Sequence, residues 1–206
     1  MDEQAAQLRA AMIAVVGRTN SGKSTLVNRL VGEKVSIVSG MEQTTRNRIR
    51  GILTEPQGQL VFLDTPGAHK AENELGTLMN RMARTAGEGA DVLMVVFDGA
   101  APVRMEDEGW MARAGFTETP TLFILNKADA AGFDAVPFHQ AWERLRAEKN
   151  ISRNVPWLEL SAETGKGCAA LLERLWIMAP AADTLLFPED IVSDFPRRLA
   201  IADMLR

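Results

Sequence analysis

Short apolar runs alternate along the chain with longer segments in which apolar residues recur at helical spacing. The apolar runs cover residues 12–16, 60–63, 92–97 and 121–125. Strands that are apolar on both faces are typical of a parallel sheet covered by helices on both sides. The segments between them predict helices at residues 22–31, 74–88, 105–113, 138–149 and 168–178. This order predicts an α/β fold with a doubly wound sheet.

Two further segments complete the predicted sheet. Residues 48–54 and 58–63 flank the turn-like sequence Glu55-Pro56-Gln57-Gly58, which predicts a hairpin and hence one antiparallel strand. Residues 157–160 follow Pro156 and read as a further strand. We therefore expect six strands, mostly parallel with one antiparallel, and helices on both faces.

Composition narrows the class of protein. The 206 residues are 46% hydrophobic and 24% charged, which excludes disordered and collagen-like chains. A single cysteine and two histidines exclude an internal disulfide and a Cys/His zinc site. The net charge of −4 argues against a domain that mainly grips nucleic-acid phosphates. The chain begins without a secretory pattern, and no apolar run approaches the ~20 residues of a membrane span, so we expect a cytoplasmic protein.

The strongest motif follows the first predicted strand and opens the first predicted helix. It reads Gly17-Arg18-Thr19-Asn20-Ser21-Gly22-Lys23-Ser24 and matches the phosphate-loop pattern of P-loop NTPases. The glycines let successive backbone N–H groups face an anion at a helix N-terminus. Lys23 would neutralise the β and γ phosphates, and Ser24 would offer a hydroxyl to Mg²⁺.

Two more motifs follow predicted strands and bear on the metal and on the base. Asp64-Thr65-Pro66-Gly67 places a carboxylate where it can reach a metal beside the phosphates, and a glycine N–H where it can face the γ-phosphate. Asn126-Lys127-Ala128-Asp129 matches Asn-Lys-x-Asp. Asp129 can accept the paired N1–H and 2-amino donors that guanine presents and adenine lacks. Lys127 can lay its stem across the base, and Asn126 can tie this loop to the phosphate loop.

A last, short motif closes the set. Ser161-Ala162-Glu163 follows the final predicted strand, where backbone N–H groups could meet guanine O6. The tripeptide is uninformative alone. It is, however, the fourth motif that follows a predicted strand, and the four motifs occur in the order typical of GTP-binding domains. Together they predict a guanine-nucleotide site.

The motifs together resemble those of the Era family of bacterial GTPases. The resemblance covers about residues 11 to 206 and rests on these matches: Gly17-Arg18-x-Asn20-x-Gly22-Lys23-Ser24-Thr25-Leu26-x-Asn28, Gln43-Thr44-Thr45-Arg46, Asp64-Thr65-Pro66-Gly67-x-His69-Lys70, Asn126-Lys127-x-Asp129, Ser161-Ala162-Glu163-Thr164-Gly165 and Phe187-Pro188-Glu189-Asp190. The chain departs from the family at Thr19 and Ser21, where proline and valine are usual. It also departs at Ala68, where a larger aliphatic residue is usual.

The resemblance implies a GTP-hydrolysing switch that acts in small ribosomal subunit assembly. It implies that residues 17–25, 64–67, 126–127, 129 and 161–163 bind GTP or GDP. It also implies that Lys23, Thr45 and Gly67 act in catalysis and that Ser24, Thr45 and Asp64 hold Mg²⁺. In some relatives that share Asn20, a potassium ion near the phosphates assists hydrolysis, and Asn20 would bind it here. Residues 34–48 and 65–76 are the expected switch segments.

The resemblance also predicts the domain organisation and the partners. Residues 8–180 are expected to form the GTPase domain, and residues 181–206 a linker toward a KH domain that binds small-subunit ribosomal RNA. No Gly-x-x-Gly loop of a KH domain follows Pro180. Either the sequence is part of a longer protein, which we expect, or the protein lacks that domain. RNA binding by this chain is then weak or lost. A monomer and peripheral membrane association are further expectations.

Three alternative functions stay open at this point. A GTPase module of a tRNA-modification or ribosome-assembly relative shares Asn20 and Thr44-Thr45-Arg46, although the sequence from Phe187 onward argues against it. A P-loop kinase for a small metabolite would make residues 126–129 a coincidence. A scaffold that binds nucleotide without hydrolysing it would show no turnover. His69, next to Ala68, is interpreted as a solvated residue and not as a general base, because GTP hydrolysis needs little help from a base.

Overall fold

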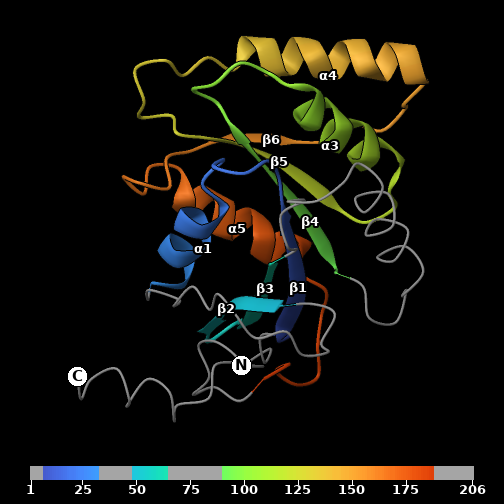
Figure 1. Ribbon diagram of the computed structural model, residues 1–206. Helices are drawn as coiled ribbons and strands as arrows, with labels where there is room; N and C mark the ends of the chain where they lie inside the picture. Colours follow the sequence, from blue (N-terminus) through green and yellow to red (C-terminus); the bar gives the residue numbers. More distant parts are fainter. Residues whose placement is uncertain (1–6, 33–47, 65–89, 188–206) are drawn as a thin grey trace, which may run out of the picture.

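A six-stranded sheet forms the centre of the computed structural model, which describes residues 7–32, 48–64 and 90–187 (Figure 1). The strands follow the order β2-β3-β1-β4-β5-β6 across the sheet. Their bounds are β1 Arg9–Val16, β2 Arg48–Glu55, β3 Gly58–Asp64, β4 Val92–Asp98, β5 Thr121–Asn126 and β6 Trp157–Glu159. The pair β2–β3 is antiparallel and all the other neighbours are parallel. The predicted sheet is confirmed, including its antiparallel hairpin.

Helices cover both faces of this sheet (Figure 1). The described helices are α1 Lys23–Val31, α3 Met105–Phe116, α4 Val136–Lys149 and α5 Cys168–Met178. Helices α1 and α5 pack on one face, and α3 and α4 pack on the other. The predicted helix over residues 74–88 lies outside the described residues. So do the predicted switch segments, apart from Arg48.

The alternation of side chains along the strands produces two large apolar cores, beside a smaller cluster of Ile52, Val61 and Leu63. In β1, Ile13 and Val15 point toward α1 and α5, whereas Ala14 and Val16 point toward α3 and α4. All four are at most 1% exposed. Each large apolar side chain that is fully buried contributes about 1.5–3 kcal/mol to the stability of the fold. Because both faces of this sheet are buried, successive residues of a strand are all apolar, which explains the continuous apolar runs in the sequence.

The parallel strands all end at one edge of the sheet. Strands β1, β3, β4, β5 and β6 all end there, and β1 has β3 on one side and β4 on the other. In doubly wound sheets, ligands bind at the carboxyl ends of the strands, where the strand order reverses. This edge is therefore where the predicted motifs should meet.

The chain after α5 runs along the opposite ends of β1 and β3. Ala10 N–H donates to Pro180 O (3.2 Å), and Ala182 N–H donates to Leu8 O (2.8 Å). The buried amide of Gln59 then pairs with the backbone of Phe187, accepting from its N–H (2.8 Å) and donating to its carbonyl (3.0 Å). The segment up to Phe187 is thus held against the sheet. The linker expected over residues 181–206 stays a prediction, because residues 188–206 lie outside the described part.

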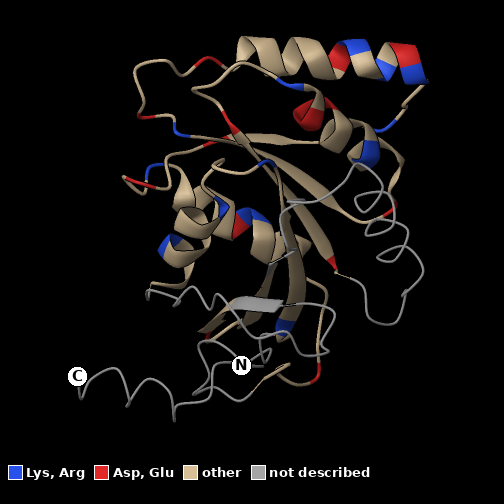
Figure 2. Cartoon of the chain, viewed as in Figure 1, with Lys and Arg blue, Asp and Glu red and all other residues tan. Residues whose placement is uncertain are grey.

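Charged residues of both signs are distributed along the described part of the chain (Figure 2). Acidic residues gather in the first turn of α3, where they complement the positive end of the helix dipole. Basic Arg113 lies in its last turn. None of the helices in the described ranges combines the length and the apolar character that a membrane span requires.

Candidate functional site

The phosphate-loop motif adopts a backbone that needs glycine at two positions. Gly17 has φ 137°, and a Cβ there would lie 2.1 Å from the Val96 carbonyl oxygen. Gly22 has φ 89°, and a Cβ there would lie 2.2 Å from Nδ2 of Asn126. Asn20, between them, is also left-handed at φ 63°. The loop therefore turns back sharply between β1 and α1 while lying directly against β4 and β5.

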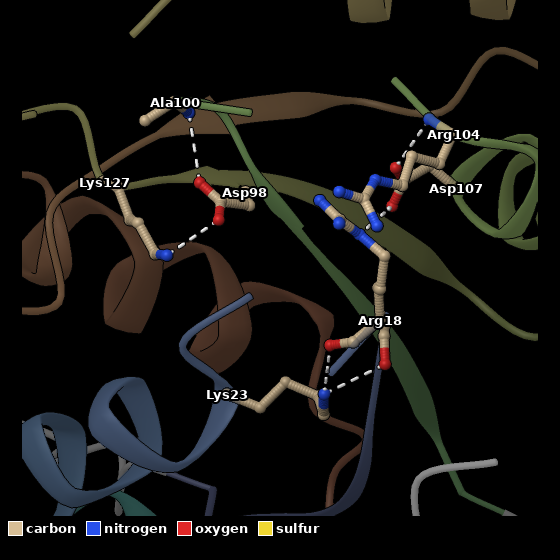
Figure 3. A network of polar contacts seen from close by, with 8 residues as sticks. Arg18, Lys23, Asp98, Ala100, Arg104, Asp107 and Lys127 are labelled. Atoms are coloured by element: carbon tan, nitrogen blue, oxygen red, sulfur yellow. Dashed lines mark hydrogen bonds and ion pairs between the residues drawn. The ribbon is translucent and has the colours of Figure 1, made fainter. Parts of the chain in front are cut away.

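The N-terminus of α1 supplies positive potential to this loop. Gly22 caps the helix without a side-chain hydrogen bond, and no acidic residue stands in the first turn. Lys23 Nζ donates to the carbonyls of Gly17 (2.9 Å) and Arg18 (2.6 Å), so the ammonium lies at the loop itself (Figure 3). A helix N-terminus beside a lysine suits a phosphate, because both the dipole and the charge favour an anion.

Asn126, the last residue of β5, joins three loops. Its side chain is buried, with Nδ2 donating to Ser21 O (2.9 Å) and Oδ1 accepting from Ala162 N–H (2.9 Å). The predicted tie between Asn126 and the phosphate loop is confirmed. The second bond was not predicted, and it attaches the Ser161-Ala162-Glu163 segment to the same side chain.

The remaining residues of the Asn-Lys-x-Asp motif lie just beyond β5. Lys127 is left-handed at φ 69°, and its Nζ contacts Oδ2 of Asp98 at 2.7 Å (Figure 3). Asp129 is exposed, so its carboxylate is open to a base. Asp98 was not among the predicted site residues, although a carboxylate directly after the apolar run of β4 is a signal that could have found it.

Helix α1 also supports the segment after β6. Arg29 donates from Nε to the Ala162 carbonyl (3.1 Å) and from its guanidinium to the Glu163 carbonyl. Ser161 is buried, and its hydroxyl accepts from Thr164 N–H (3.0 Å). These bonds hold residues 161–163 in a turn next to the phosphate loop. Arg29 was missed because a lone arginine on a helix has no motif around it.

Arg18 turns its side chain toward α3. Its Nε lies 3.6 Å from Oδ1 of Asp107, and the two side chains are 9% and 0% exposed (Figure 3). The other carboxylate oxygen of Asp107 accepts from Arg104 N–H at 3.0 Å. Burial raises the pKa of Asp107, and the Arg104 N–H and the Arg18 charge offset this rise only in part. The first residues of the phosphate loop are thereby anchored to a second helix.

Several predicted site residues cannot be placed. Thr45, Thr65, Pro66 and Gly67 lie outside the described residues, as do Ala68 and His69. The backbone of Asp64 pairs with Val15 at the end of β3, which brings this position to the sheet edge that carries the phosphate loop. Ser24 and Thr25 lie in the first turn of α1, and Thr19 is exposed in the loop. The magnesium site stays a prediction, with two of its three positions at the expected edge.

Known proteins match the chain over most of its length. A family model described as 50S ribosome-binding GTPase matches residues 12–127, more than half of the chain. The GTPase Era of a Nostoc strain is 35% identical over 200 residues, which cover 97% of this chain and 60% of that protein. The GTPase Era of a Geobacter strain is 36% identical over 202 residues, covering 97% and 65%.

Solved structures of Era proteins show the same fold. An Aquifex aeolicus Era variant bound to GDP and AlF₄⁻ superposes with a TM-score of 0.66 at 31% identity, covering 96% of this chain and 66% of that one. Era in complex with MgGDPNP and a segment of 16S ribosomal RNA gives 0.67 at 32% identity, with the same coverage. The chain thus spans somewhat less than two thirds of the length of these relatives. With the phosphate loop, the Asn-Lys-x-Asp motif and the serine segment meeting at one sheet edge, the chain belongs to the Era family of GTPases.

Proposed function

We propose that the chain binds GTP and GDP at the carboxyl edge of the sheet and hydrolyses GTP with Mg²⁺ as a molecular switch. The observation that carries this proposal is the pair of hydrogen bonds made by Asn126. They join the phosphate-loop motif and the Asn-Lys-x-Asp motif, which supports a single nucleotide that spans both. Family membership supports the same activity.

The residues divide into phosphate and base contacts. Residues 17–25, with Lys23 at their centre, hold the phosphates through backbone N–H groups and the ammonium charge. Asp129 accepts two hydrogen bonds from guanine, Lys127 lies along the base, and residues 161–163 face its O6. Adenine would leave the Asp129 oxygens unpaired, so the site should select guanine.

Magnesium is proposed to bind between the phosphates and the protein. Ser24, Thr45 and Asp64 offer the oxygen ligands that this ion prefers, and the ion would neutralise charge on the β and γ phosphates. Thr45 and Gly67 complete the catalytic set with Lys23. Because Ala68 has no polar group to orient water, we propose that Asn20 binds a potassium ion, whose charge would take the role that an arginine finger has in other GTPases.

Nucleotide titrations test the binding proposal. We expect GDP and GTP to bind and ADP and ATP to compete at least about a thousandfold more weakly. Asp129→Asn should lose roughly a hundredfold or more in GDP affinity and gain affinity for xanthosine diphosphate, whose 2-oxo group suits an amide donor. Lys23→Ala should weaken both guanine nucleotides strongly. Equal binding of GTP and ATP would contradict the proposal and favour the metabolite-kinase alternative.

Turnover tests hydrolysis separately. We expect slow, Mg²⁺-dependent release of phosphate from GTP. Tight binding of GTP without any turnover would overturn hydrolysis while leaving the binding site intact, and the non-hydrolysing scaffold would then be the better description.

We further propose that small-subunit ribosomal RNA is a partner of a longer protein that contains this domain. The support is the Era relative solved with a segment of 16S ribosomal RNA. The 206 residues themselves carry a net charge of −4 and are expected not to bind that RNA specifically. A gel shift with competitor RNA tests this. The expected monomer, cytoplasmic location and peripheral membrane association stay predictions.

A further inference from the structure

Asp98 is a partly buried carboxylate at the candidate site that none of the sequence motifs contains. It ends β4, its side chain is 13% exposed, and its Oδ2 lies 2.7 Å from Nζ of Lys127. Its other oxygen accepts from Ala100 N–H at 3.1 Å, so both oxygens of the carboxylate have a partner (Figure 3). Asp98 therefore has a fixed orientation toward a residue of the base-reading motif.

The loop that follows Asp98 is bonded to the loop that follows β5. Gly99 N–H donates to Asn126 O (3.0 Å), and Gly99 O accepts from Asp134 N–H (2.9 Å). A Cβ on Gly99 would lie 2.4 Å from Cε2 of Phe133, so the two loops are in close contact. The position of the Asp98 carboxylate relative to Lys127 is thus set by backbone bonds on both sides of the motif.

The contact with Asp98 restricts the Lys127 side chain. This side chain is 37% exposed and has four rotatable bonds, which sample many conformers when nothing holds the ammonium. The Lys127 backbone is left-handed, at φ 69°, and directly follows the buried Asn126, so the Cα–Cβ bond of Lys127 has a fixed direction. With its ammonium on Asp98, the aliphatic stem is held in one conformation before any ligand arrives. A binding surface that is ordered in advance saves the entropy otherwise lost on binding.

We propose that Asp98 is a positioning residue for guanine-nucleotide binding, which holds the Lys127 stem in place as the wall against which the base packs. The inference rests on the proposed function, because it assumes that this edge binds a guanine nucleotide. It adds a residue outside the recognised motifs and assigns it to the base side of the site. Its effect should therefore be the same for GDP and GTP, which share the base and differ in the phosphates.

The test compares GDP and GTP affinities and GDP dissociation rates in the full 206-residue chain. Asp98→Asn keeps the size of the side chain and the acceptor for Ala100 N–H, and it replaces the charged oxygen that faces Lys127 with a neutral NH₂ group. We expect its affinity to fall roughly three- to tenfold for both nucleotides, mainly through faster dissociation. Asp98→Glu restores the charge and should recover part of the loss. Asp134→Asn is the matched control, because this exposed carboxylate caps Val136 N–H in the neighbouring loop, and its neutralisation should change affinity less than twofold.

A double variant shows whether Asp98 acts through Lys127. Lys127→Met keeps the stem and removes the charge, and we expect Asp98→Asn to cost nothing further in that background. Unchanged or tighter GDP binding by Asp98→Asn, or additive losses in the double variant, would overturn the inference while the wild-type protein still binds GDP. If the wild-type protein binds no guanine nucleotide, the proposed function fails and the inference fails with it.

Discussion

Removal of the Asp107 carboxylate should destabilise the fold strongly, because Arg18 would keep a buried charge without a counter-charge. The Arg18 side chain is 9% exposed and Asp107 is fully buried. Breaking a buried ion pair by deleting one partner costs about 3–5 kcal/mol. The Nε–Oδ1 distance of 3.6 Å is long for a hydrogen bond, which favours the low end of that range. Loss of the acceptor for Arg104 N–H adds roughly 1 kcal/mol.

Urea unfolding without nucleotide measures this effect. We expect the free energy of unfolding of Asp107→Ala to fall by about 3–5 kcal/mol, a large share of the ~5–15 kcal/mol typical of a domain. Glu106→Ala is the control, because Glu106 lies in the same helical turn but is exposed, and it should cost less than about 1 kcal/mol. Arg18→Met in the Asp107→Ala background should recover part of the loss, since it removes the unpaired charge. Equal losses for the Glu106 and Asp107 variants would refute the reasoning.

The pH dependence of stability gives an independent check on the same pair. Because burial raises the pKa of Asp107, the folded protein holds this proton more tightly than the unfolded chain does. The resulting contribution to stability is fully present below the unfolded pKa of about 3.9 and is lost as the pH rises through the folded pKa. We therefore expect the difference in free energy of unfolding, wild type minus Asp107→Asn, to decrease as the pH is raised from about 3. An increase over that window would mean that attraction to Arg18 outweighs desolvation.

Three further predictions concern other residues of the site. The hydroxyl of Ser21 is buried and has no hydrogen-bond partner within the described part of the chain, so Ser21→Ala should raise the free energy of unfolding by roughly 1 kcal/mol in a urea titration. Replacing sodium by potassium at constant ionic strength should accelerate GTP turnover, and Asn20→Ala should abolish the difference; equal rates in both salts would contradict the potassium site. Burial raises the pKa of the Cys168 thiol against the lowering effect of Arg29, so a thiol reagent at pH 8 should react with native protein at least about tenfold more slowly than with unfolded protein.

The fold was largely predictable because its strands are buried on both faces. Continuous apolar runs located β1, β4 and β5, and the turn at Glu55–Gly58 located the hairpin. The ends of elements were less predictable. Helix α3 continues to Phe116, which is 65% exposed, beyond the predicted end at Arg113. Gly115 breaks the helical pattern in the sequence, whereas the helix in the structure ends only where Thr117 adopts an extended backbone.

The site was predictable where the chemistry needs a fixed local pattern. The phosphate loop needs glycine at left-handed positions and a lysine at a set spacing, so it leaves a recognisable motif. Asp98, Asp107 and Arg29 act across elements that are distant in the sequence, and each is a single charged residue among many. Their partners depend on which strands and helices become neighbours. That information is in the sheet order and not in any short stretch of sequence.

The three recognisable motifs are also less independent than their separation in sequence implies. One side chain, Asn126, donates to the phosphate loop and accepts from the segment after β6, because an amide carries a donor and an acceptor at the two ends of one group. An aspartate would face the Ser21 carbonyl with a second acceptor, and an alanine would leave the Ser21 carbonyl and the Ala162 N–H without their partner in a buried place, at about 1–3 kcal/mol each. Gly22 is required for the same reason, because any Cβ would displace this amide. The proposed phosphate binding and base recognition therefore depend on one buried hydrogen-bonded junction, and a change at Asn126 should impair both together even though it touches the loops at only two atoms.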